Sequence, residues 1–135
     1  MGRPSPGIRG EIVRRVTADL TADRFGNAGV HVLATPMLVS LCEEAALACL
    51  GPHLEPGEGS VGTRIELSHT AATPIGMTVR VEAILTQVDG RRLAFDVRAR
   101  DDREEVGVGR HERFLIDRAR FLARVAEKAQ SAHNT

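Results

Sequence analysis

The sequence of 135 residues predicts an α+β fold in which an antiparallel β-sheet wraps around one long central α-helix, with a short helix at the C-terminus. Three observations lead to this prediction. One segment is apolar almost all round, four later segments alternate between apolar and polar residues, and an Asp-Gly pair marks a hairpin between two of them. The apolar face of such a sheet must be covered, and the apolar helix is the element that can cover it.

The chain before the helix is expected to contribute one strand and a loop. Residues 1–9 are rich in Gly, Pro and Arg and are expected to be flexible, and residues 10–135 are expected to form a single domain. Residues 11–18 (EIVRRVTA) are rich in Ile, Val and Thr and predict a strand at a sheet edge or a subunit contact. Residues 19–33 lack a sustained period and predict a loop.

The central helix is predicted over residues 35–51. Thr35 is a candidate N-cap, Pro36 suits the first helical position, and Gly51 is expected to end the helix in a left-handed conformation. Glu43 and Glu44 interrupt the apolar surface. A carboxylate there needs a partner, a proton, or access to solvent or a subunit boundary.

The rest of the chain predicts four strands and a terminal helix. The strands cover residues 61–69, 77–86, 93–99 and 106–116, with a hairpin turn at Asp89 and Gly90, and the helix covers residues 117–132 with Asp117 as its cap. In the first of these strands the odd positions, which include His69, are predicted to face the core. In the last, two charged residues share the parity of apolar ones, which predicts either a bulge or an interface pair.

Composition excludes several classes of function. The formal net charge is +0 and aromatic residues make up 3% of the chain, with no Trp or Tyr, so nucleic acid and anionic membranes are not expected partners. Cys42 and Cys49 lie about 10 Å apart along one helix and cannot form a disulfide. We expect a soluble cytoplasmic protein, since no signal peptide or membrane span is seen, and no metal, since HExxH and paired CxxC motifs are absent.

Three polar residues fall where an ordinary core would have apolar ones: Thr35, Glu43 and His69. They supply a hydroxyl, a carboxylate and an imidazole, the components of a nucleophile and an acid-base system. Each has a structural alternative. Thr35 could serve only as an N-cap, the two glutamates could lie at the rim of a dimer contact, and His69 could be a hydrogen-bonded core residue.

Several strings resemble the hotdog-fold thioesterases of the fluoroacetyl-CoA thioesterase-like family, among them HVLATPMLVSLCEEAA, GSVGT, SHTAATPIGMTV and GRHERFLID. The resemblance covers residues 30–116. It implies hydrolysis of acyl-CoA thioesters without a metal or bound cofactor, by a homodimer whose sheets join and whose active sites lie at the subunit boundary. It also assigns Thr35, Glu43 and His69 as catalytic residues, the backbone N–H of Gly62 to the oxyanion, and Arg113 to a position near CoA.

In this assignment His69 carries a proton to the leaving thiol, and Glu43 either attacks the thioester or activates water. Thr35 orients the carboxylate or the carbonyl beside the positive end of the helix dipole. Fluoroacetyl-selective members have an aromatic-rich lid before the helix, whereas residues 26–33 contain no Phe, Tyr or Trp, and Glu44 replaces a large aromatic residue. Fluoroacetyl specificity is therefore not expected. The functional alternative is a non-catalytic hotdog module that binds acyl-CoA or an acyl carrier.

Overall fold

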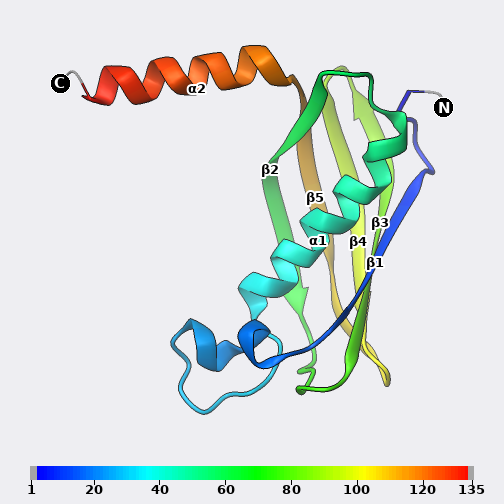
Figure 1. The fold of residues 1–135 in the computed structure, drawn as a ribbon. Helices are drawn as coiled ribbons and strands as arrows, with labels where there is room; N and C mark the ends of the chain where they lie inside the picture. Colours follow the sequence, from blue (N-terminus) through cyan, green and yellow to red (C-terminus); the bar gives the residue numbers. More distant parts are fainter. Residues whose placement is uncertain (1–2, 134–135) are drawn as a thin grey trace.

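The computed structural model describes residues 3–133, in which one curled sheet of five antiparallel strands holds a long helix against its concave face (Figure 1). The strand order is β1-β3-β4-β5-β2. The predicted wrapping of a sheet around a central helix is therefore confirmed. The elements are β1 (Arg9–Arg15), η1 (Ala18–Leu20), η2 (Ala22–Phe25), α1 (Thr35–Leu50), η3 (Gly51–His53), β2 (Glu58–His69), β3 (Thr78–Asp89), β4 (Arg92–Arg100), β5 (Glu105–Asp117) and α2 (Arg118–His133).

Both predicted ends of α1 need correction. The N-cap is Ala34, whose carbonyl accepts hydrogen bonds from the N–H groups of Met37 and Leu38, both at 3.0 Å, so Thr35 is the first helical residue. This leaves the Thr35 hydroxyl available for another partner. At the other end, Gly51 has φ −45°, which is right-handed, and the chain continues into the short helix η3. Pro52 is tolerated there because the first turn of a helix needs no N–H from it.

The first strand begins two residues earlier than predicted and ends before residue 16. It lies at an edge of the sheet, as predicted. The reason for the early start is Gly10, where β1 crosses α1. A Cβ at Gly10 would overlap the backbone of Ala45 and Cys49, so only glycine permits this approach. Of the start predicted to be flexible, residues 1–2 lie outside the described residues. Gly7 already donates a hydrogen bond of 2.8 Å to the Leu85 carbonyl.

The predicted hairpin at Asp89 and Gly90 is confirmed. Asp89 pairs with Arg92, and Gly90 has φ +61° at the first position of the two-residue loop, where glycine is favoured. Asp117 caps the last helix, since its carboxylate accepts a hydrogen bond of 3.0 Å from the Arg120 N–H. That helix is not short, however. It has 16 residues, as many as α1.

A bulge in β2 changes which side chains face α1. The pairing of β2 with β5 shifts between Gly62 and Arg64, so Thr63 is an extra residue. Ser60 and Gly62 face inward before the bulge, and Ile65 and His69 face inward after it. The prediction that Thr63 faces the core is wrong, because a bulge reverses the alternation.

A second bulge, at Val106, interrupts the alternation in β5. The extra residue lies between the paired positions Gly107 and Glu105. Beyond it, His111, Arg113 and Leu115 are buried on the inner face, whereas Arg110 and Glu112 face outward. The predicted bulge is therefore present. It does not separate the two charged residues from Val108 and Phe114, which are also exposed, so an interface pair stays a prediction.

The core lies between α1 and the concave face of the sheet. It is built from aliphatic side chains of α1 and the central strands, with Phe95 as its largest member. The covered face of α1 consists of Leu38, Leu41, Cys42, Ala45, Ala46, Cys49 and Leu50.

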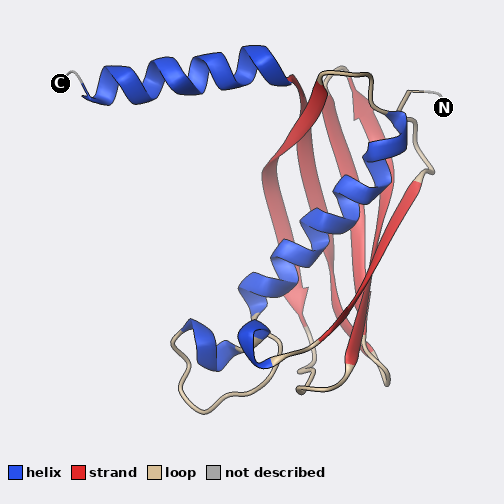
Figure 2. Cartoon of the chain, viewed as in Figure 1, coloured by secondary structure: helices blue, strands red, loops and turns tan. Residues whose placement is uncertain are grey.

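Three surfaces remain uncovered within one chain. The outer edge of β2, 12 residues long, pairs with no strand among the described residues. The face of α1 that carries Glu43, Glu44 and Leu47 is partly or fully exposed. The helix α2 extends away from the sheet beyond the β2 side (Figure 2). No helix in the described part of the chain is both long and apolar enough to cross a membrane.

Candidate active site

The predicted site residues fall into two groups in one chain, and the first group is formed by Thr35 and His69. Thr35 Oγ1, at the N-terminus of α1, lies 2.8 Å from His69 Nδ1, at the end of β2, in a hydrogen bond. The absence of a capping role for Thr35 makes this contact possible. The prediction that His69 lies on the side of the sheet facing the helix agrees with this geometry.

The other ring nitrogen of His69 is buried and has no hydrogen-bond partner in the described part of the chain. A buried polar atom without a partner is uncommon in a folded protein and is expected where a ligand or reacting group binds. Burial lowers the pKa of His69 below 6.5, and the backbone of Ala71 partly opposes this effect. His69 is therefore neutral at pH 7 and able to accept a proton.

An open hollow of about 330 Å³ lies beside the Thr35 hydroxyl and the His69 ring. Its walls come from the segment before α1 and from the chain that follows β2. The lining residues are Ala22, Asn27, Val30, Val32, Leu33, Thr35, His69, Thr70, Ala71 and Ala72. Mostly small and apolar, they leave room for a small substituent next to the imidazole.

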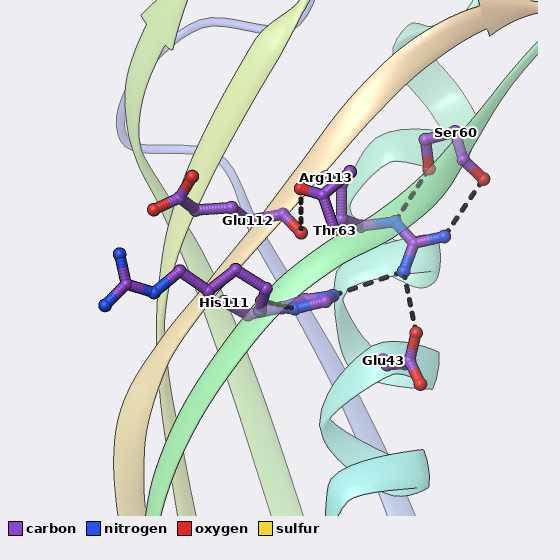
Figure 3. A network of polar contacts seen from close by, with 7 residues as sticks. Glu43, Ser60, Thr63, His111, Glu112 and Arg113 are labelled. Carbon is purple, nitrogen blue, oxygen red and sulfur yellow. Dashed lines mark hydrogen bonds and ion pairs between the residues drawn. The ribbon is translucent and has the colours of Figure 1, made fainter.

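The second group is centred on the buried guanidinium of Arg113, on β5, whose side chain is only 5% exposed (Figure 3). Its Nε donates to Ser60 Oγ at 2.8 Å and its Nη2 donates to the Ser60 carbonyl at 3.0 Å. Its Nη1 lies 3.3 Å from Glu43 Oε2 and 3.2 Å from His111 Nε2. Burial lowers the pKa of Arg113 and Glu43 opposes that shift, so the guanidinium stays charged.

The hydrogen bonds of His111 determine its tautomer. Its Nδ1 lies 2.9 Å from the carbonyl oxygen of Arg64, which can only accept, so Nδ1 carries the proton. The other nitrogen then accepts from Arg113. Burial, with a smaller contribution from Arg113, lowers the pKa of His111, while the Arg64 carbonyl, Glu43 and Glu112 act in the opposite direction. A neutral His111 thus steers the guanidinium toward Glu43.

Gly62 lies directly against the Glu43 carboxylate. A Cβ at this position would be 2.6 Å from Glu43 Oε2 and 3.3 Å from both Arg113 Nη1 and His111 Cε1. Such a distance to a carboxylate oxygen is not sterically allowed, so glycine is what permits Glu43 to occupy this position. The oxyanion contact predicted for the Gly62 N–H would form at this same point of β2, next to the Glu43 carboxylate.

Expectations from the sequence also concern Arg113 and Glu44. Arg113 was predicted near CoA, and its guanidinium is directed at Ser60, His111 and Glu43. Glu44 was expected, as a structural alternative, at the rim of a dimer contact. It forms an ion pair of 2.8 Å with Arg14 of the same chain.

Sequence reasoning missed His111 and Ser60 as members of this group. His111 stands among glycines and charged residues, a context that does not point to a site. The signal that could have found it is its spacing of two from Arg113, which places both side chains on one face of a strand. Ser60 reaches the inner face only because of the bulge at Thr63, which the sequence pattern does not reveal.

The two groups are well separated within one chain. Thr35 and Glu43 are eight residues apart on α1, about 12 Å along the helix axis. Gly62 and His69 are seven residues apart on β2, about 20 Å along the strand. Both groups nevertheless border the free edge of β2. In the described residues no cluster of three His, Cys, Asp or Glu side chains could hold a metal ion.

Known proteins resemble this chain in sequence and in fold. The family model described as fluoroacetyl-CoA-specific thioesterase matches residues 16–119. The chain belongs to that family. The fluoroacetyl-CoA thioesterase of Streptantibioticus cattleyicolor is 50% identical to it over 98 residues, which are 73% of this chain and 70% of that protein.

Solved structures agree with this membership. A crystal structure of a phenylalanine-to-alanine mutant of the fluoroacetyl-CoA-specific thioesterase superposes with a TM-score of 0.88 at 40% identity, covering 95% of this chain and 99% of that one. A thioesterase superfamily member from Thermus thermophilus gives 0.91 at 31% identity, covering 98% and 99%. The hotdog fold predicted from the sequence is thereby confirmed.

Proposed function

We propose that this protein is an acyl-CoA thioesterase that hydrolyses a small or medium acyl-CoA to the free acid and CoA, and that it acts as a homodimer. Membership of a thioesterase family carries the reaction class. The absence of aromatic residues from 26–33 argues against a preference for fluoroacetyl, and the open hollow beside Thr35 and His69 has room for a small or medium acyl group.

The dimer follows from the two separated groups and from the free edge of β2. A long unpaired edge strand is usually covered in a stable protein. If two copies pair their β2 strands antiparallel about a two-fold axis near Ile65 and Glu66, Gly62 of one chain lies opposite His69 of the partner subunit. Each active site then combines the Glu43 group of one chain with the Thr35 and His69 pair of the other.

The chemistry assigned to each group follows from its surroundings. Hydrolysis replaces the C–S bond of the thioester with a C–O bond, and the leaving thiolate must gain a proton. Neutral His69 is suited to accept a proton from water at its unpartnered nitrogen and then, as the imidazolium, to give a proton to the leaving thiolate. Glu43, held by Arg113 and 42% exposed, either attacks the carbonyl carbon or takes a proton from the attacking water.

The remaining residues act on the carbonyl oxygen. The Thr35 hydroxyl, at the N-terminus of α1, orients the substrate where the helix dipole favours developing negative charge. We assign the Gly62 N–H as a donor to the same oxyanion, and Arg113 as a residue that acts through Glu43. We expect no requirement for a metal or bound cofactor, so activity should survive treatment with a chelator.

The decisive experiment follows thiol release from a panel of short and medium acyl-CoAs with a disulfide dye. The dye should not react with the enzyme itself, because Cys42 and Cys49 are buried and burial raises the pKa of Cys42 to about 12. We expect turnover on at least one substrate. Losses of about 100-fold or more are expected for Glu43→Gln and for His69→Ala.

Glu44→Gln is the matched control, since Glu44 pairs with Arg14 outside both groups and its loss should leave turnover close to that of the parent. Absence of turnover on every substrate, or full activity of both site variants, would overturn the proposal. Tight binding of an acyl-CoA without hydrolysis would support the non-catalytic module instead. A monomeric mass in sedimentation at micromolar concentration would contradict the dimer.

A further inference from the structure

The helix α2 extends from the body of the protein and packs little against its own chain (Figure 1). Phe121 is partly buried, but every described side chain beyond it is exposed, including Leu122 at 55% and Val125 at 48%. A single helix of 16 residues is only marginally stable in water without packing. The extended position of α2 therefore indicates that another surface covers it.

One face of α2 has the pattern of a packing face. Leu122, Val125 and Ala129 are spaced by three and four residues and form an apolar stripe. Arg120, Arg124 and Lys128 are spaced by four and form a basic ridge that runs obliquely to the stripe. Only Lys128, at the C-terminal end of the ridge, flanks the stripe, and Arg120 lies on the opposite face. A surface that fits the stripe must therefore be apolar, with acidic groups favoured at its margin.

The net charge of α2 is opposite in sign to the net charge of the rest of the chain. The helix carries four basic residues and one acidic residue, a net charge of +3, so the remaining residues carry fourteen basic and seventeen acidic residues, a net charge of −3. Charge complementarity of this kind favours association of α2 with the body of a protein of the same sequence.

The end of the fold opposite to α2 offers a matching surface, which we call the acidic end. It carries Asp19 and Asp23 in the short helices and Asp101 and Asp102 after β4. In the part of the chain that the structure describes, none of these four carboxylates forms an ion pair with an arginine or lysine. Two large apolar side chains are exposed at the same end, Phe25 and Ile75.

The helix cannot reach the acidic end of its own chain. It begins where Asp117 pairs with Glu58, and the 13 residues of β5, about 40 Å, separate that point from the acidic end. In the dimer proposed above, the antiparallel pairing of β2 brings the start of α2 next to residues 70–76 of the partner subunit. These residues belong to the acidic end.

We infer that α2 docks on the acidic end of a second copy of this chain, with its apolar stripe against Ile75 and Phe25 of the partner subunit and the flanking Lys128 toward the carboxylates. This inference rests on the proposed dimer. It also places α2 at the rim of the hollow that contains Thr35 and His69, so each subunit would complete the substrate entrance of the other.

Disulfide trapping in the full chain tests this contact. The double variant Val125→Cys, Ile75→Cys should form a covalent dimer under mild oxidation, and the distance along β5 requires the bond to be intermolecular. The control is Glu127→Cys, Ile75→Cys, which places the thiol on the opposite face of α2. The native cysteines are buried and should not contribute.

A charge test keeps the inference falsifiable if the disulfide geometry is unfavourable. Arg124→Glu, Lys128→Glu should weaken the dimer about tenfold at low salt and less at high salt, since screening weakens exposed pairs. Arg91→Glu, Arg92→Glu, with the same change of net charge on the β3–β4 hairpin, should leave dimerisation unchanged.

Equal trapping in both cysteine pairs, or no trapping together with no effect of the α2 charges on a dimer seen by sedimentation, would overturn the inference and leave the proposed function intact. A monomer would overturn both. Binding of the parent to phosphatidylserine vesicles through α2, with no trapping, would overturn it in favour of a membrane surface.

Discussion

The Thr35 and His69 pair differs from the Glu43 group in how completely its polar atoms are satisfied. His69 keeps one buried nitrogen without a partner and borders an open hollow. Arg113, by contrast, uses its donors on Ser60, His111 and Glu43, and His111 is fixed by a backbone carbonyl. The first arrangement leaves a group ready to exchange a proton, and the second holds a carboxylate in one place.

Both groups use α1 and β2, and the Glu43 group also takes His111 and Arg113 from β5. These buried side chains from a third element supply the hydrogen bonds that the Thr35 and His69 pair lacks. The Arg113 side chain lies under β2, where a missing hydrogen bond is costly, while Thr35 lies at an exposed helix end. We therefore expect changes in the Glu43 group to affect stability as well as rate, and changes in the pair to affect mainly rate.

The largest expected effect comes from a mixed dimer that carries a different site variant in each chain. A purified mixed dimer of one Glu43→Gln chain and one His69→Ala chain would keep one complete site if each site combines both subunits, and should have about half the parent's activity. If both groups acted within one chain, neither site would be complete and the loss should be about 100-fold or more. Thiol release from the mixed dimer, with the two variant homodimers as controls, measures this.

Gly62→Ala should test the Glu43 group without the Thr35 and His69 pair, because the added Cβ displaces mainly the Glu43 carboxylate. The added Cβ would be 2.6 Å from the carboxylate oxygen, which lies at the free end of a side chain and can turn away. We expect kcat to fall about tenfold, corresponding to about 1.4 kcal/mol in the barrier, while the fold persists. Gly51→Ala is the control, because no atom lies within 4 Å of its added Cβ. Equal rates in the two variants would contradict the role assigned to Gly62.

Removal of His111 should show how much unfolding free energy is lost when hydrogen bonds of the Glu43 group are broken. His111→Leu leaves an Arg113 donor and the Arg64 carbonyl without their partner, which should cost about 1–3 kcal/mol of unfolding free energy. Thr35→Val removes a hydrogen bond at an exposed helix end and should cost about 1 kcal/mol or less. Urea denaturation of both variants tests the order. A larger loss for Thr35→Val would show that the two groups have been assigned the wrong roles.

The smallest effect concerns pH. Burial lowers the pKa of both His69 and His111 below 6.5 in the folded protein, so below pH 6.5 the unfolded chain binds more protons. The stabilisation from these neutral rings is present above pH 6.5 and is lost as the pH falls through the lowered values. Urea midpoints should therefore decrease from pH 7.5 to pH 5.5, and by less in His111→Leu. An equal decrease in parent and variant would exclude a contribution from His111.

Much of the fold could be predicted because its signals are local. The apolar surface of residues 35–50, the alternation in the later strands and the Asp-Gly turn each depend on near neighbours in the sequence. What could not be predicted depends on contacts distant in sequence. From the sequence, Gly10 is expected to interrupt a strand, but in the structure α1 crosses over it. Thr35 is expected to cap the helix, but its Oγ1 lies 2.8 Å from His69 Nδ1.

The candidate site was predicted unevenly for the same reason. Thr35, Glu43 and His69 were named from the residues themselves and then from the family resemblance. Gly62 and Arg113 were named from the resemblance alone, and the grouping of all five in space was not predicted. His111 has an unremarkable sequence context, and its importance arises from the carbonyl of Arg64 on another strand. The inner position of Ser60 depends on an extra residue that simple alternation does not reveal.

That extra residue, Thr63, decides which side chains of β2 reach α1. Ser60 and Gly62 face the helix before it, and Ile65 and His69 face the helix after it. Deletion of Thr63 would leave an unbroken alternation in which Gly62 and His69 both still face α1. Insertion or deletion of one residue in the regular part of the strand that follows would instead turn His69 to the outer face of the sheet. The number of residues in that part of β2 is therefore itself a part of the active site.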